Sequence, residues 1–208
     1  MKKHALVIFI IISVYSCNSS DKNVPGNNAD STGTSAANNP IDSASIEKGF
    51  DINRVSLSDK QLATFPYFNL PDGYQSGANQ KAKDFDRFPF WVGDHFEWVE
   101  GKIYSNYIRP KEGKEFSGYE VLKYLDNEFA GAGALQVFKG EIPPDSSHWL
   151  NNHFNALIVN YVDGLGDIYN DPTSTYIIHR KDKNIWIHLC VGSMSGGWII
   201  ADQSPLIK

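Results

Sequence analysis

The large aromatic side chains of this chain are confined to the part that follows about residue 65, and this limits where a core can form. All five tryptophans and most tyrosines and phenylalanines lie at or beyond Phe65. Residues 18–46 are instead rich in Asn, Ser, Asp, Gly, Ala and Thr. Such a segment cannot bury enough apolar surface to offset the entropy lost on ordering. We therefore expect a flexible linker over residues 17–64 and one folded domain over residues 65–208.

The first residues have the pattern of an export signal. Lys2, Lys3 and His4 form a basic start, and residues 5–14 are apolar apart from Ser13. This run is about half the roughly 20 residues that a membrane-spanning helix needs. The pattern predicts a signal peptide over residues 1–16 that is removed from the mature protein.

The end of this signal resembles the bacterial lipobox, in which a cysteine is acylated and becomes the mature N-terminus. The residues are Val14-Tyr15-Ser16-Cys17, and a polar segment follows them at once. Two or three acyl chains, palmitate among them, anchor a protein stably where one does not. We expect a lipoprotein held through Cys17 to the cell envelope, at the outer membrane. The alternative is an ordinary secretory signal in which Cys17 is incidental.

Charge and cysteine content exclude several classes of partner and stabilising bond. Removing residues 1–16 deletes two lysines and no acidic residue, so the formal net charge changes from −5 to about −7. A mildly acidic protein has no electrostatic reason to bind nucleic acid. Cys190 is the only other cysteine, so with Cys17 acylated we expect it to be a small buried apolar side chain rather than half of a disulfide.

Hydrophobic periodicity predicts an α+β fold. Ser117 to Ala130 reads as a helix, because Tyr119, Leu122, Leu125 and Phe129 recur at helical spacing and Ser117 with Glu120 forms a capping box. Residues 150–161 give a weaker helical pattern. Strand patterns occupy residues 88–104, with a turn at Gly101, and residues 135–142, 175–180, 185–189 and 198–201. Short connections favour antiparallel pairing, so we expect a mainly antiparallel sheet with about two helices on one face.

The last hairpin should have two different faces. Trp186 shares one face with His188, whereas Ile185, Ile187 and Leu189 share the other. We expect the all-apolar face to pack against the helices. Trp186 is then expected to cover the opposite face or to line a ligand groove.

Several segments together resemble a poorly characterised domain found before the peptidoglycan-binding domain in some OmpA-family envelope proteins. They are Phe85-Asp-Arg-Phe-Pro-Phe-Trp-Val-Gly-Asp, Trp98-Val-Glu-Gly-Lys, Gly164-Leu-Gly-Asp-Ile-Tyr-Asn, Thr175-Tyr-Ile-Ile-His-Arg, Ile185-Trp-Ile-His-Leu and Ser195-Gly-Gly-Trp. The resemblance covers residues 65–203 and brings no catalytic residue with it. Because the chain stops at Lys208, we expect the lipid at Cys17, and not a peptidoglycan-binding domain, to hold it in the envelope.

Candidates for metal binding and nucleophilic catalysis are weak. His179 and His188 would be diagonal neighbours if the hairpin turn centred on Asp182-Lys183, but no third ligand is evident. In Gly192-Ser-Met-Ser-Gly the central residue of a hydrolase-like elbow is Met194, not serine. Cys190 and His188 share a strand face. We expect no catalytic residue, no metal and no cofactor.

Two clusters of acidic residues remain. Asp163, Asp167, Asn170 and Asp171 could offer calcium ligands, but these residue types are also the usual turn formers and the spacing is not that of an EF-hand. Asp94, Glu97 and Glu100 flank Trp91 and Trp98, and acids beside aromatic rings occur in sugar-binding clefts.

The sequence therefore predicts a non-enzymatic binding or scaffolding module. Its candidate ligand-binding residues are Trp91, Asp94, Trp98 and Trp186, and its expected partners are the membrane and an envelope protein or glycan. The alternative is an envelope hydrolase of cell-wall or surface polymers, which would need convergent titratable groups in a concave pocket.

Overall fold

The structure is a computed structural model that describes residues 50–153 and 161–203. Cys17, the predicted signal peptide and residues 18–46 lie outside the described residues. Within the described ranges, no helix is long and apolar enough to cross a membrane.

A seven-stranded sheet, in which every pair of neighbours is antiparallel, forms the body of the folded unit. Its order is β1-β3-β7-β6-β5-β4, with β2 pairing to β3 beside this path. The strands are β1 (Tyr74–Ser76), β2 (Lys81–Trp91), β3 (Phe96–Pro110), β4 (Leu135–Gly140), β5 (Thr173–His179), β6 (Asn184–Val191) and β7 (Gly196–Gln203). The predicted fold class, α+β with a mainly antiparallel sheet, is confirmed.

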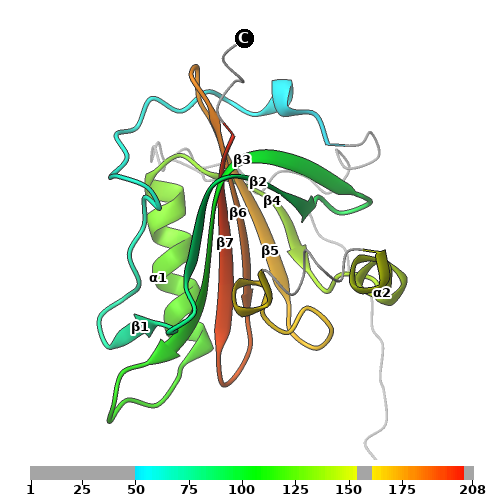
Figure 1. The fold of residues 1–208 in the computed structure, drawn as a ribbon. Coiled ribbons are helices and arrows are strands. Elements are labelled where there is room, and N and C mark those ends of the chain that lie inside the picture. Colours follow the sequence, from blue (N-terminus) through cyan, green and yellow to red (C-terminus); the bar gives the residue numbers. More distant parts are fainter. Residues whose placement is uncertain (1–49, 154–160, 204–208) are drawn as a thin grey trace, which may run out of the picture. The chain divides into compact units, whose positions relative to one another are not determined.

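Helix α1 (Gly118–Gly131) carries the chain from β3 to the far edge of the sheet, where β4 begins. Strands β4, β5, β6 and β7 then return one by one until β7 pairs with β3 (Figure 1). Short elements complete the unit: the 3-10 helix η2 (Ile52–Arg54), α2 (Pro144–His153) and a helical stretch over residues 161–165. The predicted hairpin of β5 and β6 is confirmed.

Both faces of the central strands are buried. Ile185, Ile187 and Leu189 pack with α1 in one core, as the sequence predicts. Trp186, on the alternate face of β6, belongs to a second core together with Phe88 and Phe90 of β2. The two cores exist because β6 and β7 have apolar residues at successive positions. A strand with one face in water would instead alternate apolar and polar residues.

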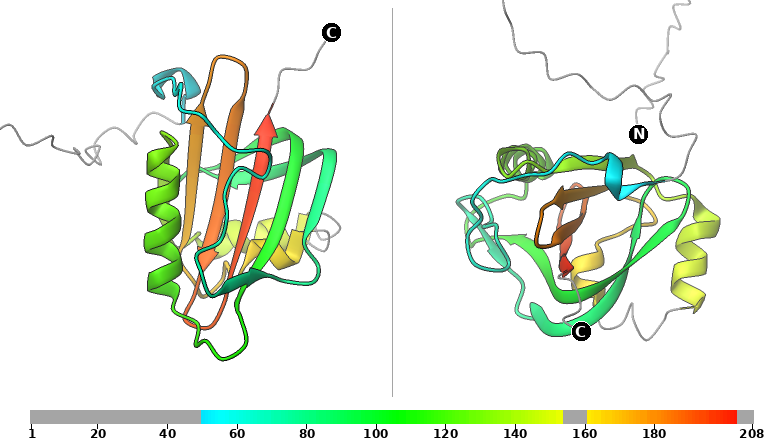
Figure 2. Two further views of the ribbon diagram at one scale, coloured as in Figure 1. Left: turned by 90° about the vertical axis from the view of Figure 1, so that its left-hand side faces the viewer. Right: turned by 90° about the horizontal axis from the view of Figure 1, so that it is seen from above.

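The helices are divided between these faces, which corrects the expectation that both cover the same one. Leu125 and Phe129 of α1 lie in the first core, whereas Leu150 of α2 and Tyr161 lie in the second. Figure 2 shows α1 and α2 on opposite sides of the sheet. A sheet that is apolar on both faces needs cover on both.

Helix α1 begins where the capping pattern predicts. The Ser117 hydroxyl accepts a hydrogen bond from the Glu120 amide at 3.3 Å. The Glu120 carboxylate does not complete the box, because it accepts from Tyr74 Oη at 2.9 Å instead. The Ser117 amide donates to that same hydroxyl at 3.0 Å, so Tyr74 joins the helix start to β1. Tyr119 was expected on the buried face but is 76% exposed.

Gly101 lies within β3 and not at a turn, which corrects the prediction of two strands separated there. The β2–β3 turn is instead at residues 92–95, where the Val92 amide donates to the His95 carbonyl at 3.0 Å. At Gly101 the backbone passes so close to β7 that an added Cβ would lie 2.1 Å from the Asp202 carbonyl oxygen. The glycine is needed for close approach of two strands.

Residues before Phe65 also pack on the sheet, so the compact unit extends beyond the predicted start at residue 65. The Phe50 ring contacts Trp186 with ring centroids 5.1 Å apart. Val55 is buried, and Leu57 forms a bridge to His179.

We predict that Gly101→Ala lowers the free energy of unfolding by about 1–3 kcal/mol, the usual cost of forcing an extra group into a packed site. Gly131→Ala is the matched control, because an added Cβ there meets nothing within 4 Å. At that helical position alanine should be neutral or stabilise by up to about 1 kcal/mol. Urea unfolding of the two variants measures both effects. Equal stability of Gly101→Ala and the parent protein would contradict the close-approach interpretation.

Candidate functional site

Three of the sequence-predicted site residues lie at one end of the β2–β3 hairpin but do not form a common surface. Trp91 is buried, edge to face with Phe96 at a centroid distance of 4.9 Å. Asp94 is exposed in the turn, and its Oδ1 lies 2.6 Å from Nδ1 of His95. Trp98 is half-buried, with the Arg87 guanidinium 4.8 Å from its ring centroid. Trp91 is therefore part of the core, because its ring completes an aromatic cluster.

Trp186, the fourth candidate, lies on β6 in the same core. It is only 2% exposed, and its Nε1 donates to Gln203 Oε1 at 3.1 Å. It lines a cavity of about 240 Å³ beside Phe50 and Glu97. Trp186 thus lies on the face opposite α1, as the sequence predicts, but it is buried there because Phe50 and Phe90 pack on its ring.

The histidine and cysteine candidates are separated or inert. The hairpin register places Thr175 opposite His188 and Asn184 opposite His179, so the two histidines are not diagonal neighbours. The predicted turn centre was wrong by one residue. Within residues 50–153 and 161–203, no group of three His, Cys, Asp or Glu side chains could hold a metal ion.

His188 and Cys190 do share a face of β6, but neither has the protonation state of a catalytic pair. Burial lowers the pKa of His188 to about 4, and its Nε2 lies 2.8 Å from the Leu165 carbonyl oxygen, to which it donates. Burial raises the pKa of the Cys190 thiol to about 12. A nucleophilic cysteine needs a lowered pKa and a neighbouring base, so this thiol stays protonated at neutral pH.

The acidic loop after residue 163 is built by turn hydrogen bonds. The Asp167 carboxylate accepts from the Tyr169 amide at 3.3 Å and from the Asn170 side chain at 2.9 Å. Burial and the neighbouring Asp167 raise the pKa of Asp171. These contacts are those of turn-forming Asp and Asn.

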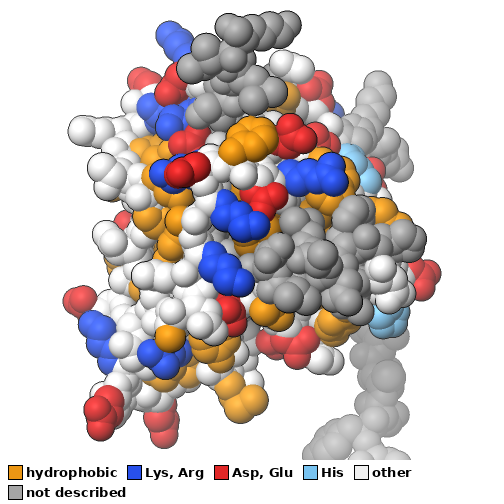
Figure 3. Space-filling model, viewed as in Figure 1, with side chains coloured by type: hydrophobic (Ala, Val, Ile, Leu, Met, Phe, Trp, Pro, Cys, Tyr) orange, Lys and Arg blue, Asp and Glu red, His pale blue; other side chains and the backbone are white. Residues whose placement is uncertain are grey.

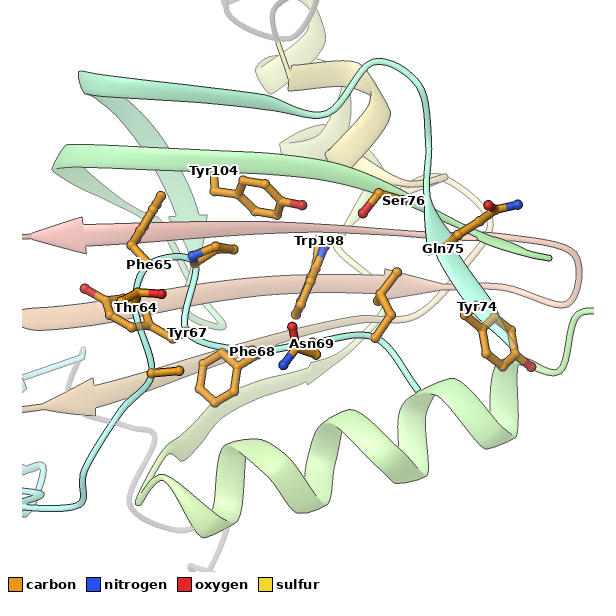
Figure 4. A pocket seen from close by; sticks show the side chains of 13 residues that line it. Thr64, Phe65, Tyr67, Phe68, Asn69, Tyr74, Gln75, Ser76, Tyr104 and Trp198 are labelled. Carbon is orange, nitrogen blue, oxygen red and sulfur yellow. The ribbon is translucent and has the colours of Figure 1, made fainter. Parts of the chain in front are cut away.

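A different place on the sheet has the geometry of a ligand site. The segment before β1 crosses the α1 face, and beneath it lies a cavity of about 430 Å³ (Figure 4). This volume is within the range of about 300–1,000 Å³ that is typical of small-molecule sites. We call it the strap cavity. Six aromatic residues line it: Phe65, Tyr67, Phe68, Tyr74, Tyr104 and Trp198.

The remaining lining of the strap cavity is neutral. Hydrogen-bonding side chains come from Thr64, Asn69, Gln75 and Ser76. Its other described lining residues are Ala63, Pro66 and Leu70. No described lining residue is therefore Asp, Glu, Lys, Arg, His or Cys.

The crossing segment is fixed through Tyr67. This residue has a φ of +75°, a left-handed conformation that is uncommon for residues other than glycine. Its hydroxyl donates to Asp202 and accepts from Lys183 Nζ at 3.0 Å, and Lys183 also contacts Asp202 at 2.9 Å. Burial, followed by the hydrogen bond to Asp202, raises the pKa of Tyr67 to about 12. This network ties the segment to the ends of β6 and β7.

Trp198 lines the strap cavity and carries a buried donor without a partner. The residue is 1% exposed, and its Nε1 has no hydrogen-bond partner among the described residues. Directly across from it on β3, Asn106 is fully buried and its Oδ1 also has no partner. Asn106 Nδ2 donates to the hydroxyl of Ser76 at 2.9 Å, so the amide nitrogen of Asn106 is paired and only its oxygen is not. A buried polar group left unpaired costs about 1–3 kcal/mol.

Little in the local sequence pattern pointed to this site. The run from Phe65 to Tyr74 reads as an extended stretch ending in a turn at Pro71-Asp72-Gly73, and that turn is present, with the Tyr74 amide donating to the Pro71 carbonyl at 3.1 Å. Tyr104 and Trp198 read as strand residues. Only the pairing of β3 with β7, and the crossing of the segment above them, brings these groups together.

No protein-family model matches the chain, and no curated protein matches it. The site is therefore judged by its own geometry and chemistry.

We predict that His188 makes the protein less stable in mild acid. Its pKa is lowered on folding from 6.5 to about 4, so the unfolded state binds more protons in that interval. The stability that depends on neutral His188 is complete above about pH 6.5 and falls as the pH drops towards 4, by an amount on the order of 3 kcal/mol.

The check is the free energy of urea unfolding between pH 7.5 and 4.5. In His188→Gln an amide can still donate to the Leu165 carbonyl, but nothing titrates, so its stability should fall less steeply with acid. The comparison at pH 7.5 isolates any packing change. Parallel pH profiles for the two proteins would show that His188 is not the titrating group.

Proposed function

We propose that this chain is a lipid-anchored protein of the bacterial cell envelope that acts by binding a ligand and not by catalysis. The anchor is inferred from the sequence, in which the lipobox-like Val14-Tyr15-Ser16-Cys17 follows a basic start and a short apolar run. The outer membrane is the proposed location.

The observation that carries the binding role is the strap cavity with its aromatic lining. Concave sites lined by aromatic rings and a few polar groups are typical of small-molecule binding. An enzyme would instead need a nucleophile, an acid or a base in reach of the substrate. The described lining offers only Ser, Thr and Tyr hydroxyls, with no Asp, Glu, His, Lys or Cys side chain beside them to act as a base, and the pKa of Tyr67 is raised to about 12.

The hydrolase alternative has less support. Its best nucleophile is Cys190 beside His188, and burial shifts both pKa values away from the thiolate–imidazolium pair that such catalysis uses. Acidic and basic side chains are interspersed on the face shown in Figure 3, and the chain as a whole is acidic. These features favour neither polyanion binding nor an electrostatic membrane contact.

The proposal includes a relationship to the domain that precedes the peptidoglycan-binding domain in some OmpA-family proteins. It rests on motifs alone, among them Trp98-Val-Glu-Gly-Lys and Ile185-Trp-Ile-His-Leu. In this proposal the lipid at Cys17 holds the domain in the envelope, where an envelope protein or glycan is within reach.

We predict that Cys17→Ala abolishes incorporation of a palmitate analogue and prevents maturation, because no thiol remains to be acylated. Cys190→Ala is the matched control: it removes the other cysteine, which is 1% exposed, and should still be labelled. Metabolic labelling followed by carbonate washing of membranes measures both. Labelled, membrane-bound Cys17→Ala protein would show that the anchor lies elsewhere.

A further inference from the structure

We propose that residues 61–72, the segment that crosses above the strap cavity, form a lid that opens as one unit with Tyr67 as its latch. We call this segment the strap. Its opening is the route by which a ligand reaches the aromatic rings of the cavity. The inference rests on the proposed binding function and adds how access to that site is controlled.

The aromatic rings of the cavity are almost completely covered in this structure. Trp198 is 1% exposed, Phe68 8% and Tyr104 9%, although all three line the cavity. Figure 4 shows the strap residues Phe68 and Asn69 along one side of the cavity and Tyr104 along the other. Small-molecule sites bury most of a ligand's surface against their walls, and these rings offer almost no free surface. A ligand that packs on them therefore needs the strap to move.

The strap is fixed to the sheet just before and just after its own residues. Before it, the Ser58 amide donates to the His179 carbonyl at 2.7 Å. After it, the Gly73 carbonyl accepts from the Lys111 amide at 2.8 Å, and β1 then pairs with β3. Both ends therefore stay attached when the part between them lifts, which makes them the hinges of the lid.

Between these hinges, side chains and not the backbone hold the strap down. Among the described residues, its backbone–backbone hydrogen bonds lie only within local turns, as where the Tyr67 amide donates to the Thr64 carbonyl at 2.8 Å. The Phe68 ring packs on Phe129 with ring centroids 4.8 Å apart, and the Tyr67 hydroxyl donates to Asp202. A segment without backbone bonds to its surroundings opens at a lower free energy than the strands beneath it.

Tyr67 has the properties of a strained latch. Within residues 50–153 and 161–203 it is the only residue other than glycine with a positive φ, at +75°. Such strain persists only where the surroundings hold the residue in place, and it is common at clamps and switch regions. The hydroxyl is held between Asp202 and Lys183. Without it, Lys183 would still contact Asp202 at 2.9 Å, so the latch can be removed while the buried charges stay paired.

The test follows chymotrypsin cleavage of the Phe68–Asn69 bond in the full mature chain, held in a nonionic detergent, with fragments identified by mass spectrometry. The protease takes the Phe68 side chain into its own pocket, so cleavage requires this ring to leave Phe129. Cleavage through a local opening exposes little surface, and its rate should depend only weakly on low concentrations of urea. Global unfolding of the same protein should depend on urea steeply.

Tyr67→Phe keeps the ring but loses a hydrogen bond to a charged group, so it should speed this cleavage by about tenfold. Tyr104→Phe is the matched control. It removes another hydroxyl from the cavity wall, one that donates to Gln80 at 3.1 Å outside the strap, and should be cleaved at the parental rate. Urea unfolding of each variant establishes that it is folded.

Hydrogen exchange of the indole N–H groups, followed in ¹⁵N-tryptophan-labelled protein, shows whether the opening reaches the cavity wall. Trp91 is the internal reference, because its Nε1 is buried without a described partner, like that of Trp198, but lies in the other core. The Trp198 indole should exchange faster than the Trp91 indole and with a weaker dependence on urea.

The outcomes separate the lid from the binding function on which it rests. Cleavage that depends on urea as steeply as global unfolding overturns the lid, and the binding role then stands only for a ligand at the exposed rim near Thr64 and Asn69. An unchanged rate in Tyr67→Phe, or equal acceleration in Tyr104→Phe, overturns Tyr67 as the latch. Rapid cleavage while the Trp198 indole exchanges only on global unfolding overturns the binding role of the cavity, because opening then gives no access to its rings.

Discussion

The two-sided burial of the central strands is the constraint on which the rest of this structure depends. Strands β6 and β7 place apolar side chains on both faces, with Ile187 and Ile200 towards α1 and Trp186 and Ile199 towards the other core. Each face must be removed from water, at roughly 25 cal/mol of stabilisation per Å² of apolar surface buried. Helix α1 covers one face, and the β2–β3 hairpin with α2 and its neighbours covers the other. The short loops of the sheet alone would leave both faces wet.

The cover on the α1 face is incomplete, and the strap cavity is the consequence. Helix α1 packs on this face through Leu125 and Phe129, and Phe129 reaches Trp198 of β7 with ring centroids 6.5 Å apart. The irregular segment that precedes β1 covers the part of the face around Tyr104 and Trp198. An irregular segment has no regular face to pack, so it depends on particular anchors, of which the contact of Tyr67 with Lys183 and Asp202 is the most polar. The space between these anchors is lined by aromatic rings, and the cross-strand pair Asn106 and Trp198 has hydrogen-bonding capacity to spare.

A binding role and a lipid anchor are physically compatible on this chain. The proposed lipid is at Cys17, the described fold begins at Phe50, and residues 18–46 between them in the sequence are polar. The titratable groups that the sequence offered for metal binding or for catalysis are used in other ways. His188 holds the Leu165 carbonyl, and Asp167 shapes its own turn. Burial of Cys190 and His188 keeps both uncharged, which stabilises a core and prevents nucleophilic chemistry.

The sequence by itself determined the local elements. The Ser117 cap, the helix that follows it and the β5–β6 hairpin all depend on neighbours within a few residues, so their patterns are visible along the chain. The sequence could not determine what covers each face of the sheet. Alternation along β6 assigns its side chains to two faces but does not indicate which elements pack on either face. For this reason the packing of Phe50 and Phe90 on Trp186 was not foreseen, and Gly101 was read as a turn although it permits close approach of β7. The strap cavity was decided only by tertiary structure, since its lining joins residues 63–76 to Tyr104 and Trp198 across strands whose pairing no local pattern encodes.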